Sequence, residues 1–124
     1  MMSVIMLTLP GDYLSLESYR KNGEAIRTPV WFAEANNSIY IYTLTKTAKV
    51  KRVRNNPQVR IAQCDFRGNL KGDWIDAKAT IVEGKEDAFG HSILRKKYTW
   101  QKAFGDLMSH ILKRQRTVIR LDSR

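Results

Sequence analysis

The sequence predicts a mainly β protein, an antiparallel barrel or sandwich with one short inserted helix and a helical C-terminal segment. Three observations lead to this prediction. Several segments alternate between apolar and polar residues and are rich in β-branched and aromatic side chains. Asparagine and glycine residues typical of tight turns separate the first of these segments. The apolar period becomes helical in only two places, near residues 47 and 87. Antiparallel meanders of this kind close on themselves because closure removes exposed strand edges.

The first half of the chain contains two predicted hairpins. The turn at residues 21–24 contains Asn-Gly, which tolerates the positive φ angles of tight turns, and Asn36-Asn37 forms the next turn. Pro29 has no backbone N–H and interrupts its strand's ladder, so we expect it at an edge, a bulge or a ligand-facing gap. The strands are expected at residues 13–19, 25–33 and 38–43.

The second half begins with a short helix that ends before Pro57. Val50 and Val53 are expected to anchor this helix to the barrel, whereas Gly90 and Gly105 should weaken the later helical segment. The predicted elements are a helix over 47–56, a strand over 58–65, a loop over 67–72, a strand over 74–83, a helical segment from 87 to about 114 and a closing strand over 117–121.

Length and composition favour one soluble domain over residues 1–124. The hydrophobic fraction of 43% and charged fraction of 27% are those of a globular protein. Cys64 is the only cysteine, which excludes an internal disulfide framework and a four-cysteine zinc site. The early apolar run, residues 4–7, is too short for a signal peptide core or a membrane span. We therefore expect a cytoplasmic protein with no membrane association.

The formal net charge of +10 suggests an anionic partner: nucleic acid, a phosphate-bearing cofactor or an acidic surface. Residues 46–60 hold six basic side chains and no acidic one. A second basic stretch, residues 95–116, contains Asp106 as its only acid. A solvated helix face and a basic tail would also account for such runs.

The junction between the third strand and the first helix has the chemistry of an anion site. The free N–H groups of a first helical turn attract anions, and Thr45 or Thr47 can cap the helix and donate a hydroxyl to a phosphate. Lys46, Lys49 and Arg52 lie three apart, along one stripe of the helix. A capped basic surface helix without a ligand would have the same pattern, so both interpretations remain open at this point.

Residues 13–82 contain several ordered motifs: Arg27-Thr28-Pro29-Val30-Trp31-Phe32, Tyr42-Thr43, Thr47, Lys49, the Lys-x-x-Arg spacing of Lys49 and Arg52, Asn55-Asn56-Pro57 and Cys64-Asp65-Phe66-Arg67-Gly68. Together these motifs resemble the pyridoxamine 5'-phosphate oxidase-related, FMN-binding split β-barrel superfamily, and within it the deazaflavin-dependent oxidoreductases. The resemblance implies a homodimeric split barrel with its cofactor at the dimer interface. The cofactor would be FMN or coenzyme F-420, the 8-hydroxy-5-deazaflavin, whose acidic tail could use part of the basic surplus.

By this resemblance, the second strand lines the cofactor ring and ribityl chain, largely through backbone groups, and Thr43 lies at the ribityl end. Thr47 and Lys49 would hold the phosphate, with Arg52 as a helper. Ala48 stands where the true oxidases have arginine, which weakens the phosphate site for FMN. The predicted cofactor-binding residues are Arg27, Thr28, Pro29, Val30, Trp31, Thr43, Lys46, Thr47, Ala48, Lys49 and Arg52.

The resemblance predicts hydride transfer between the bound cofactor and a small molecule, and not vitamin B6 oxidation. No catalytic acid, base or metal site is recognisable; His91, His110 and Cys64 are interpreted as structural, and Trp74 as a core, interface or cofactor-contacting residue. The alternatives are a flavin-binding protein without turnover, a haem-binding protein of this fold and a basic nucleic-acid-binding protein. Nucleic acid is disfavoured because the aromatic residues mostly alternate within strands.

Overall fold

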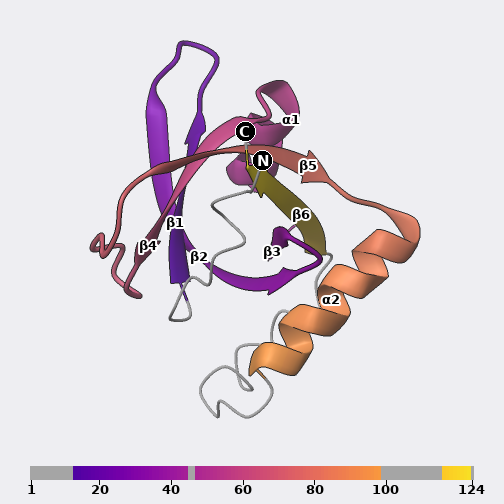
Figure 1. Cartoon of the computed structure of the whole chain (residues 1–124). Coiled ribbons are helices and arrows are strands. Elements are labelled where there is room, and N and C mark those ends of the chain that lie inside the picture. The colour runs from indigo at the N-terminus through magenta and orange to yellow at the C-terminus, as the bar shows by residue number, and fades with distance from the viewer. Residues whose placement is uncertain (1–12, 45–46, 99–115, 124) are drawn as a thin grey trace.

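A computed structural model describes residues 13–44, 47–98 and 116–123 of this 124-residue chain. Six antiparallel strands within this part form a closed barrel in the order β1-β2-β3-β6-β5-β4 (Figure 1). This confirms the predicted mainly β fold class. The elements are β1 (Tyr13–Tyr19), β2 (Ala25–Ala35), β3 (Ser38–Leu44), α1 (Ala48–Asn55), β4 (Gln58–Cys64), β5 (Ile75–Ile81), α2 (Gly84–Tyr98) and β6 (Arg116–Ser123).

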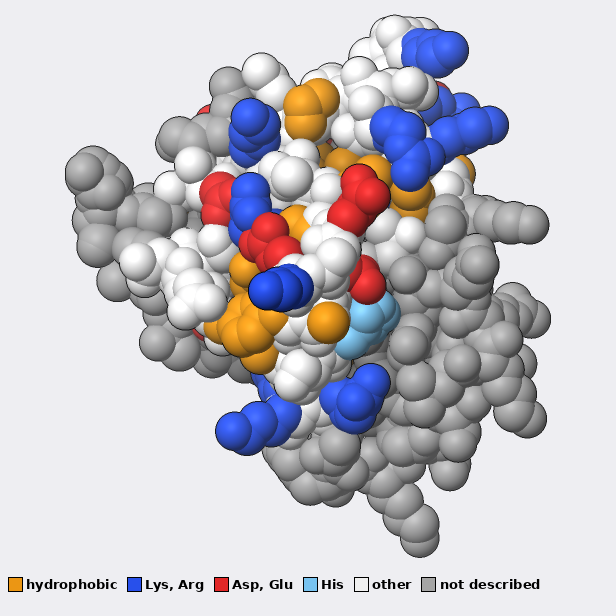
Figure 2. Space-filling view, turned by 90° about the vertical axis from the view of Figure 1, so that its right-hand side faces the viewer, with side chains coloured by type: hydrophobic (Ala, Val, Ile, Leu, Met, Phe, Trp, Pro, Cys, Tyr) orange, Lys and Arg blue, Asp and Glu red, His pale blue; other side chains and the backbone are white. Residues whose placement is uncertain are grey.

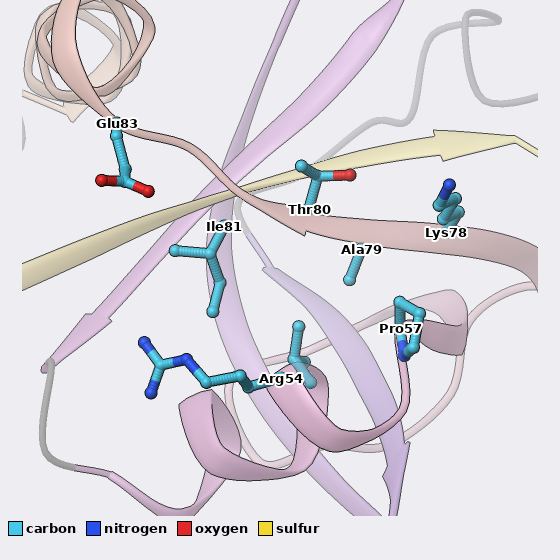
Figure 3. Close-up of a pocket in the computed structure, with 8 residues that line it drawn as sticks. Arg54, Pro57, Lys78, Ala79, Thr80, Ile81 and Glu83 are labelled. Atoms are coloured by element: carbon cyan, nitrogen blue, oxygen red, sulfur yellow. The ribbon is translucent and has the colours of Figure 1, made fainter.

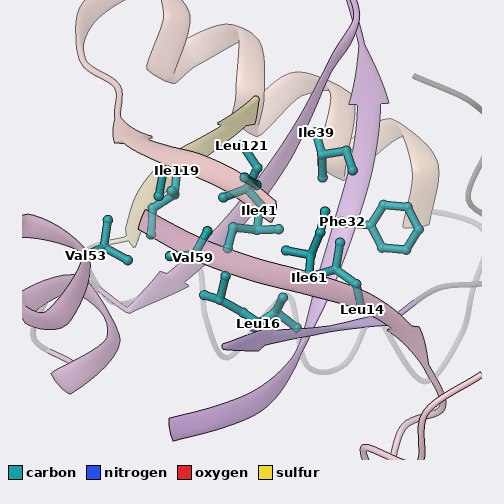
Figure 4. Close-up of a cluster of buried hydrophobic side chains, with 13 residues drawn as sticks. Leu14, Leu16, Phe32, Ile39, Ile41, Val53, Val59, Ile61, Ile119 and Leu121 are labelled. Carbon is teal, nitrogen blue, oxygen red and sulfur yellow. The ribbon is translucent and has the colours of Figure 1, made fainter. Parts of the chain in front are cut away.

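The barrel interior is an apolar core to which all six strands contribute (Figure 4). Because side chains alternate across a strand, one face of each strand fills this core. Helix α1 contributes Val53, which is 3% exposed, and its neighbour Val50 is also buried. The predicted anchoring of this helix is therefore confirmed. The core residues are Leu14, Leu16, Val30, Phe32, Ile39, Ile41, Val53, Val59, Ile61, Ala77, Ala79, Ile119 and Leu121.

A second, smaller core lies between α2 and the outside of the barrel. It contains Tyr40 of β3, Leu94 of α2 and Val118 of β6. A Cβ atom on Gly90 would lie only 2.5 Å from Cγ1 of Val118. The expectation that Gly90 only weakens the helix was thus incomplete, because the missing side chain lets α2 approach β6. Figure 2 shows acidic and basic side chains interspersed on this side of the molecule.

The turn predictions are confirmed, and several boundaries move by one to three residues. Asn36 and Asn37 have φ angles of 52° and 67° and join β2 directly to β3, while Gly23 has φ 90° in the first hairpin. Helix α2 begins at Gly84, three residues before the predicted start, and the rest of the predicted helical segment, with Gly105, lies outside the described residues. No described helix is long and apolar enough to span a membrane.

Strand β2 is paired along only part of one edge. It pairs with β1 from Ala25 to Trp31, but its described pairing with β3 covers only Phe32 to Ala35. If the register continued, Val30 would stand opposite Thr43. The two strands instead part there, and the β3-facing edge of residues 25–30 has no strand partner in the described chain. This opening in the ladder lies in the stretch that contains Pro29, as its missing N–H predicted.

Candidate functional site

The start of α1 forms one side of the candidate site. Thr47 is the N-cap, with an extended backbone (φ −104°, ψ 160°), but its side chain makes no capping hydrogen bond. Its Oγ1 atom instead lies 3.5 Å from Oγ1 of Thr43, near the end of β3. The first turn of α1 contains no acidic residue. The hydroxyl and the free first-turn N–H groups are thus available to an anion.

Lys49 adds a positive charge to this side of the site. Its side chain is half-buried, and burial, followed by the nearby charge of Arg52, lowers the pKa of its amine. No carboxylate in the described part of the chain pairs with it. A partly desolvated cation without a carboxylate is favourably placed for an anionic ligand, whose charge would offset the desolvation.

Arg52 is oriented by β1. Its Nε atom donates a 2.7 Å hydrogen bond to Oγ of Ser18, a residue that is 1% exposed. Burial, and then the charge of Arg20, lowers its pKa. Arg52 thus connects α1 to the barrel and keeps a guanidinium close to Lys49, which is consistent with its predicted helper role but adds a structural one.

The residues predicted on β2 divide between two faces. Arg27, Pro29 and Trp31 pair with Glu17, Ser15 and Tyr13 on the outer face of the barrel. Thr28 and Val30 lie on the inner face. Val30 is part of the core, so only its backbone can face a ligand. The Oγ1 atom of Thr28 is buried and has no hydrogen-bond partner in the described residues.

Arg27 belongs to a cluster that the sequence analysis missed. The carboxylate of Glu17, only 1% exposed, accepts hydrogen bonds from Arg27 Nε (2.8 Å), Arg60 Nε and Nη2 (2.6 and 3.1 Å) and the Tyr19 hydroxyl (2.6 Å). Its pKa is lowered to about 2, mainly by the bond from Arg60, while burial opposes the shift. Trp74 lies against both guanidiniums, 4.7 and 5.0 Å from its ring centroid.

A sequence signal for this cluster existed. A turn over residues 21–24 sets the register of the first hairpin, and that register places Glu17 opposite Arg27. The approach of Arg60 depends on the pairing of β1 with β4. That pairing joins segments more than forty residues apart and could not be predicted from local patterns.

The other candidates occupy ordinary positions or fall outside the described residues. Ala48 is the exposed first residue of α1, and Lys46 lies outside the described part of the chain, as does His110. His91 is partly buried, with Nε2 3.4 Å from Asp87. Cys64 is buried in β4, and burial raises the pKa of its thiol, as expected of a structural cysteine.

A separate hollow of about 400 Å³ lies between α1 and β5 (Figure 3). Val53, Pro57, Ala79 and Ile81 provide its apolar surface, and charged side chains stand at its rim. None of the residues predicted to bind the cofactor lines it. The residues predicted to bind the cofactor lie on β2 and at the β3–α1 junction, apart from this hollow.

Comparison with known proteins supports the fold. No protein-family model and no curated protein matches the chain. Among solved structures, a Listeria innocua protein provisionally described as a pyridoxamine 5'-phosphate oxidase is 13% identical, with a TM-score of 0.65 over 92% of this chain and 85% of that one. The Vibrio cholerae heme storage protein HutZ is 17% identical (TM-score 0.67; 91% and 82% covered). An F420 reductase is 19% identical (TM-score 0.59; 91% and 86% covered).

The chain has the split-barrel fold of these proteins. At 12–19% identity the similarity shows the fold alone. Proteins of this fold include flavin- or deazaflavin-related oxidoreductases as well as a heme storage protein, so the fold does not decide between these chemistries.

Proposed function

We propose that this protein is an oxidoreductase that binds FMN or coenzyme F-420 and passes a hydride between that cofactor and a small molecule. The observation that carries the proposal is the site at the β3–α1 junction. There, the Thr47 hydroxyl makes no capping bond, and the half-buried Lys49 has no described carboxylate partner. Both residues follow β3 beyond the point where its described pairing with β2 ends.

Each part of this site fits one part of such a cofactor. The Thr47 hydroxyl, the first-turn N–H groups of α1 and the Lys49 amine would hold the phosphate. Thr43 would face the ribityl chain. The backbone edge of residues 25–30, which has no strand partner in the described chain, would offer N–H and C=O groups to the polar rim of the ring, and the Thr28 hydroxyl, which has no described hydrogen-bond partner, would supply a further polar group. The bound cofactor supplies the redox chemistry.

We also propose that two copies associate, as the resembled family implies. Pro29 is exposed on the outer face of β2, two residues before the partly buried Trp31. The loop after β4 presents Phe66 and Leu70, which are 63% and 44% exposed. Exposed apolar side chains of this size are typical of an interface. Sedimentation velocity would test this, and a monomer at micromolar concentration would contradict it.

The direct test of the proposed function is a binding titration with FMN and, separately, with coenzyme F-420. Lys49→Ala should weaken binding of the preferred cofactor at least about tenfold, because it removes a charge-assisted contact to the phosphate. Lys51→Ala is the matched control, since Lys51 is an exposed lysine on the same helix. Equal affinities of the two variants, or no binding of either cofactor by the wild type, would contradict the proposal.

Turnover needs its own test. The cofactor-loaded protein would be reduced and then exposed to a panel of small electron acceptors, with reoxidation followed by absorbance. Faster reoxidation with one acceptor class than in cofactor solution alone is expected of an enzyme. A parallel titration with hemin tests whether the protein binds haem instead of a flavin. Tight hemin binding that displaces FMN would contradict the proposed flavin or deazaflavin cofactor.

A further inference from the structure

Strand β5 loses its neighbour β4 at Pro57. The last bond of their ladder is donated by the N–H group of Ala79 to the Pro57 carbonyl, at 2.8 Å. Proline has no N–H group to return to the Ala79 carbonyl, so this bond of the ladder is missing. Ile81 is the next residue whose backbone groups point to the same edge, and the register would place it opposite Asn55, which instead belongs to α1. On this edge Ile81 has no strand partner in the described chain.

The hollow of about 400 Å³ between α1 and β5 lies where this ladder ends (Figure 3). Its wall is apolar: Val53 and Ala79 are each 3% exposed, and Pro57 and Ile81 complete it. Small-molecule sites of this size combine an apolar wall with a few polar groups. Water could hydrate the backbone groups but would leave the wall wet. A ligand with a polar head and an apolar body satisfies both.

Two side chains of opposite charge, Arg54 of α1 and Glu83 just after β5, stand at one end of the hollow (Figure 3). Both are exposed, and neither forms an ion pair or a side-chain hydrogen bond with a described residue. Lys78 also borders the hollow, but the register of β5 with β6 places it opposite Asp122 on the outer face of the barrel. The end of the hollow near Ile81 therefore offers one cation and one carboxylate.

We propose that this hollow binds an apolar α-amino acid, whose main chain takes the place of a strand residue opposite Ile81. The carboxylate of the ligand accepts hydrogen bonds from the Ile81 N–H and from Arg54. Its ammonium donates to the Ile81 carbonyl and to Glu83. Its side chain packs on Val53 and Ala79. The site uses none of the residues proposed to bind the cofactor, so it does not depend on the proposed function.

The test is a titration of the isotope-labelled wild-type protein with L-leucine at pH 7, followed by the NMR signal of the Ile81 amide. We expect a saturating shift at Ile81 and none at Ile75, a residue of the same strand that β4 does pair. Three probes each lack one part of leucine: isocaproate the ammonium, isoamylamine the carboxylate and glycine the apolar side chain. Each should bind at least about tenfold more weakly than leucine. A probe that binds as tightly as leucine, or a shift at Ile81 no larger than at Ile75, would overturn the proposal.

Variants at the two charged positions make the assignment specific. Arg54→Gln and Glu83→Gln should each weaken leucine binding about tenfold, because each removes one charged partner and leaves the apolar wall intact. Arg67→Gln, at an exposed arginine in the loop after β4, is the matched control and should bind leucine like the wild type. Lys49→Ala is expected to weaken cofactor binding but not leucine binding, so failure of one site is distinguishable from failure of the other. Unchanged leucine affinity in both Arg54→Gln and Glu83→Gln would contradict the proposed contacts, and the wild-type titration decides the question even if a variant does not fold.

Discussion

On each of two faces of the barrel, a glutamate accepts hydrogen bonds from a tyrosine hydroxyl and from arginine, but the two networks differ in composition. On the β1–β2–β4 face, Glu17 binds the Tyr19 hydroxyl and two arginines. On the face under α2, Glu86 binds the Tyr40 hydroxyl and one arginine, Arg120.

The difference lies in the balance of charge. Arg120 donates Nη1 to both oxygens of Glu86, at 2.8 and 2.7 Å, and Nε to Asp122 at 2.8 Å. Ser38 donates a further short hydrogen bond to Asp122. The α2 face therefore has two carboxylates for one arginine, whereas on the β1–β2–β4 face two arginines share Glu17, and the register places Asp76 opposite Arg60. The side chain of Glu17 is 1% exposed and that of Glu86 is 35% exposed, so the two networks also differ in burial.

The largest expected effect concerns acid stability on the β1–β2–β4 face. The folded pKa of Glu17 is about 2 against an ordinary 4.5, so its ionised form stabilises the fold above pH 4.5, and this stabilisation is lost as the pH falls from 4.5 toward 2. The loss is on the order of 3 kcal/mol. Urea unfolding at pH 7 and at steps down to pH 2.5 measures it.

The matched variants for that experiment are Glu17→Gln and Glu86→Gln. Glu17→Gln should be less stable at pH 7 and much less sensitive to acid than the wild type. Glu86→Gln should retain most of the acid sensitivity, because Glu86 is 35% exposed and its lowered pKa contributes less. Identical acid profiles for Glu17→Gln and the wild type would remove the contrast between the two faces.

The next largest effect concerns the packing of α2. Gly90→Ala places a methyl group 2.5 Å from Val118 Cγ1 and 3.3 Å from Cδ2 of Tyr40, so the helix or the strand must move. We expect a loss of about 2 kcal/mol in the free energy of unfolding, measured by thermal denaturation. Ser92→Ala, at an exposed position of the same helix, should be neutral or slightly stabilising. A Gly90→Ala protein as stable as the wild type would show that α2 does not pack closely on β6.

A smaller effect is expected from Arg120→Gln, which leaves Glu86 and Asp122 without their common cation. All three side chains are about one-third exposed, so solvent limits the destabilisation to about 1 kcal/mol. Arg95→Gln, in an exposed part of α2, serves as the control in urea unfolding. If both variants lost equal stability, the α2 network would have no specific role.

The smallest effect on stability is expected at Thr47. Replacing an N-cap threonine usually destabilises a helix by about 1 kcal/mol. Thr47→Val should change the free energy of unfolding by less than about 0.5 kcal/mol, because the Thr47 side chain makes no capping bond. The same variant should weaken cofactor binding, whereas Thr47→Ser should not. A large loss of stability in Thr47→Val would mean that the hydroxyl serves the helix rather than a ligand.

The strands and tight turns could be predicted because their determinants are local. Asn36-Asn37 and the Asn-Gly pair specify turns by their tolerance of positive φ, and the alternation of side chains specifies the strands between them. The position of the proposed phosphate site could also be predicted, since a helix N-terminus and its threonines and lysines lie in one short segment. The Glu17 cluster could not, because Arg60 reaches it only through the pairing of β1 with β4.

By itself the sequence determined the mainly β class, the hairpins, the short basic helix after the third strand and the identity of the candidate anion ligands. These depend on residues within a few positions of one another. Only the tertiary structure decided that the pairing of β2 with β3 ends before Thr43 and that Lys49 is half-buried. It also decided that the missing side chain at Gly90 lets α2 pack against the barrel. Each of these depends on segments brought together by closure of the barrel, and burial and charge balance arise from that closure rather than from any local pattern.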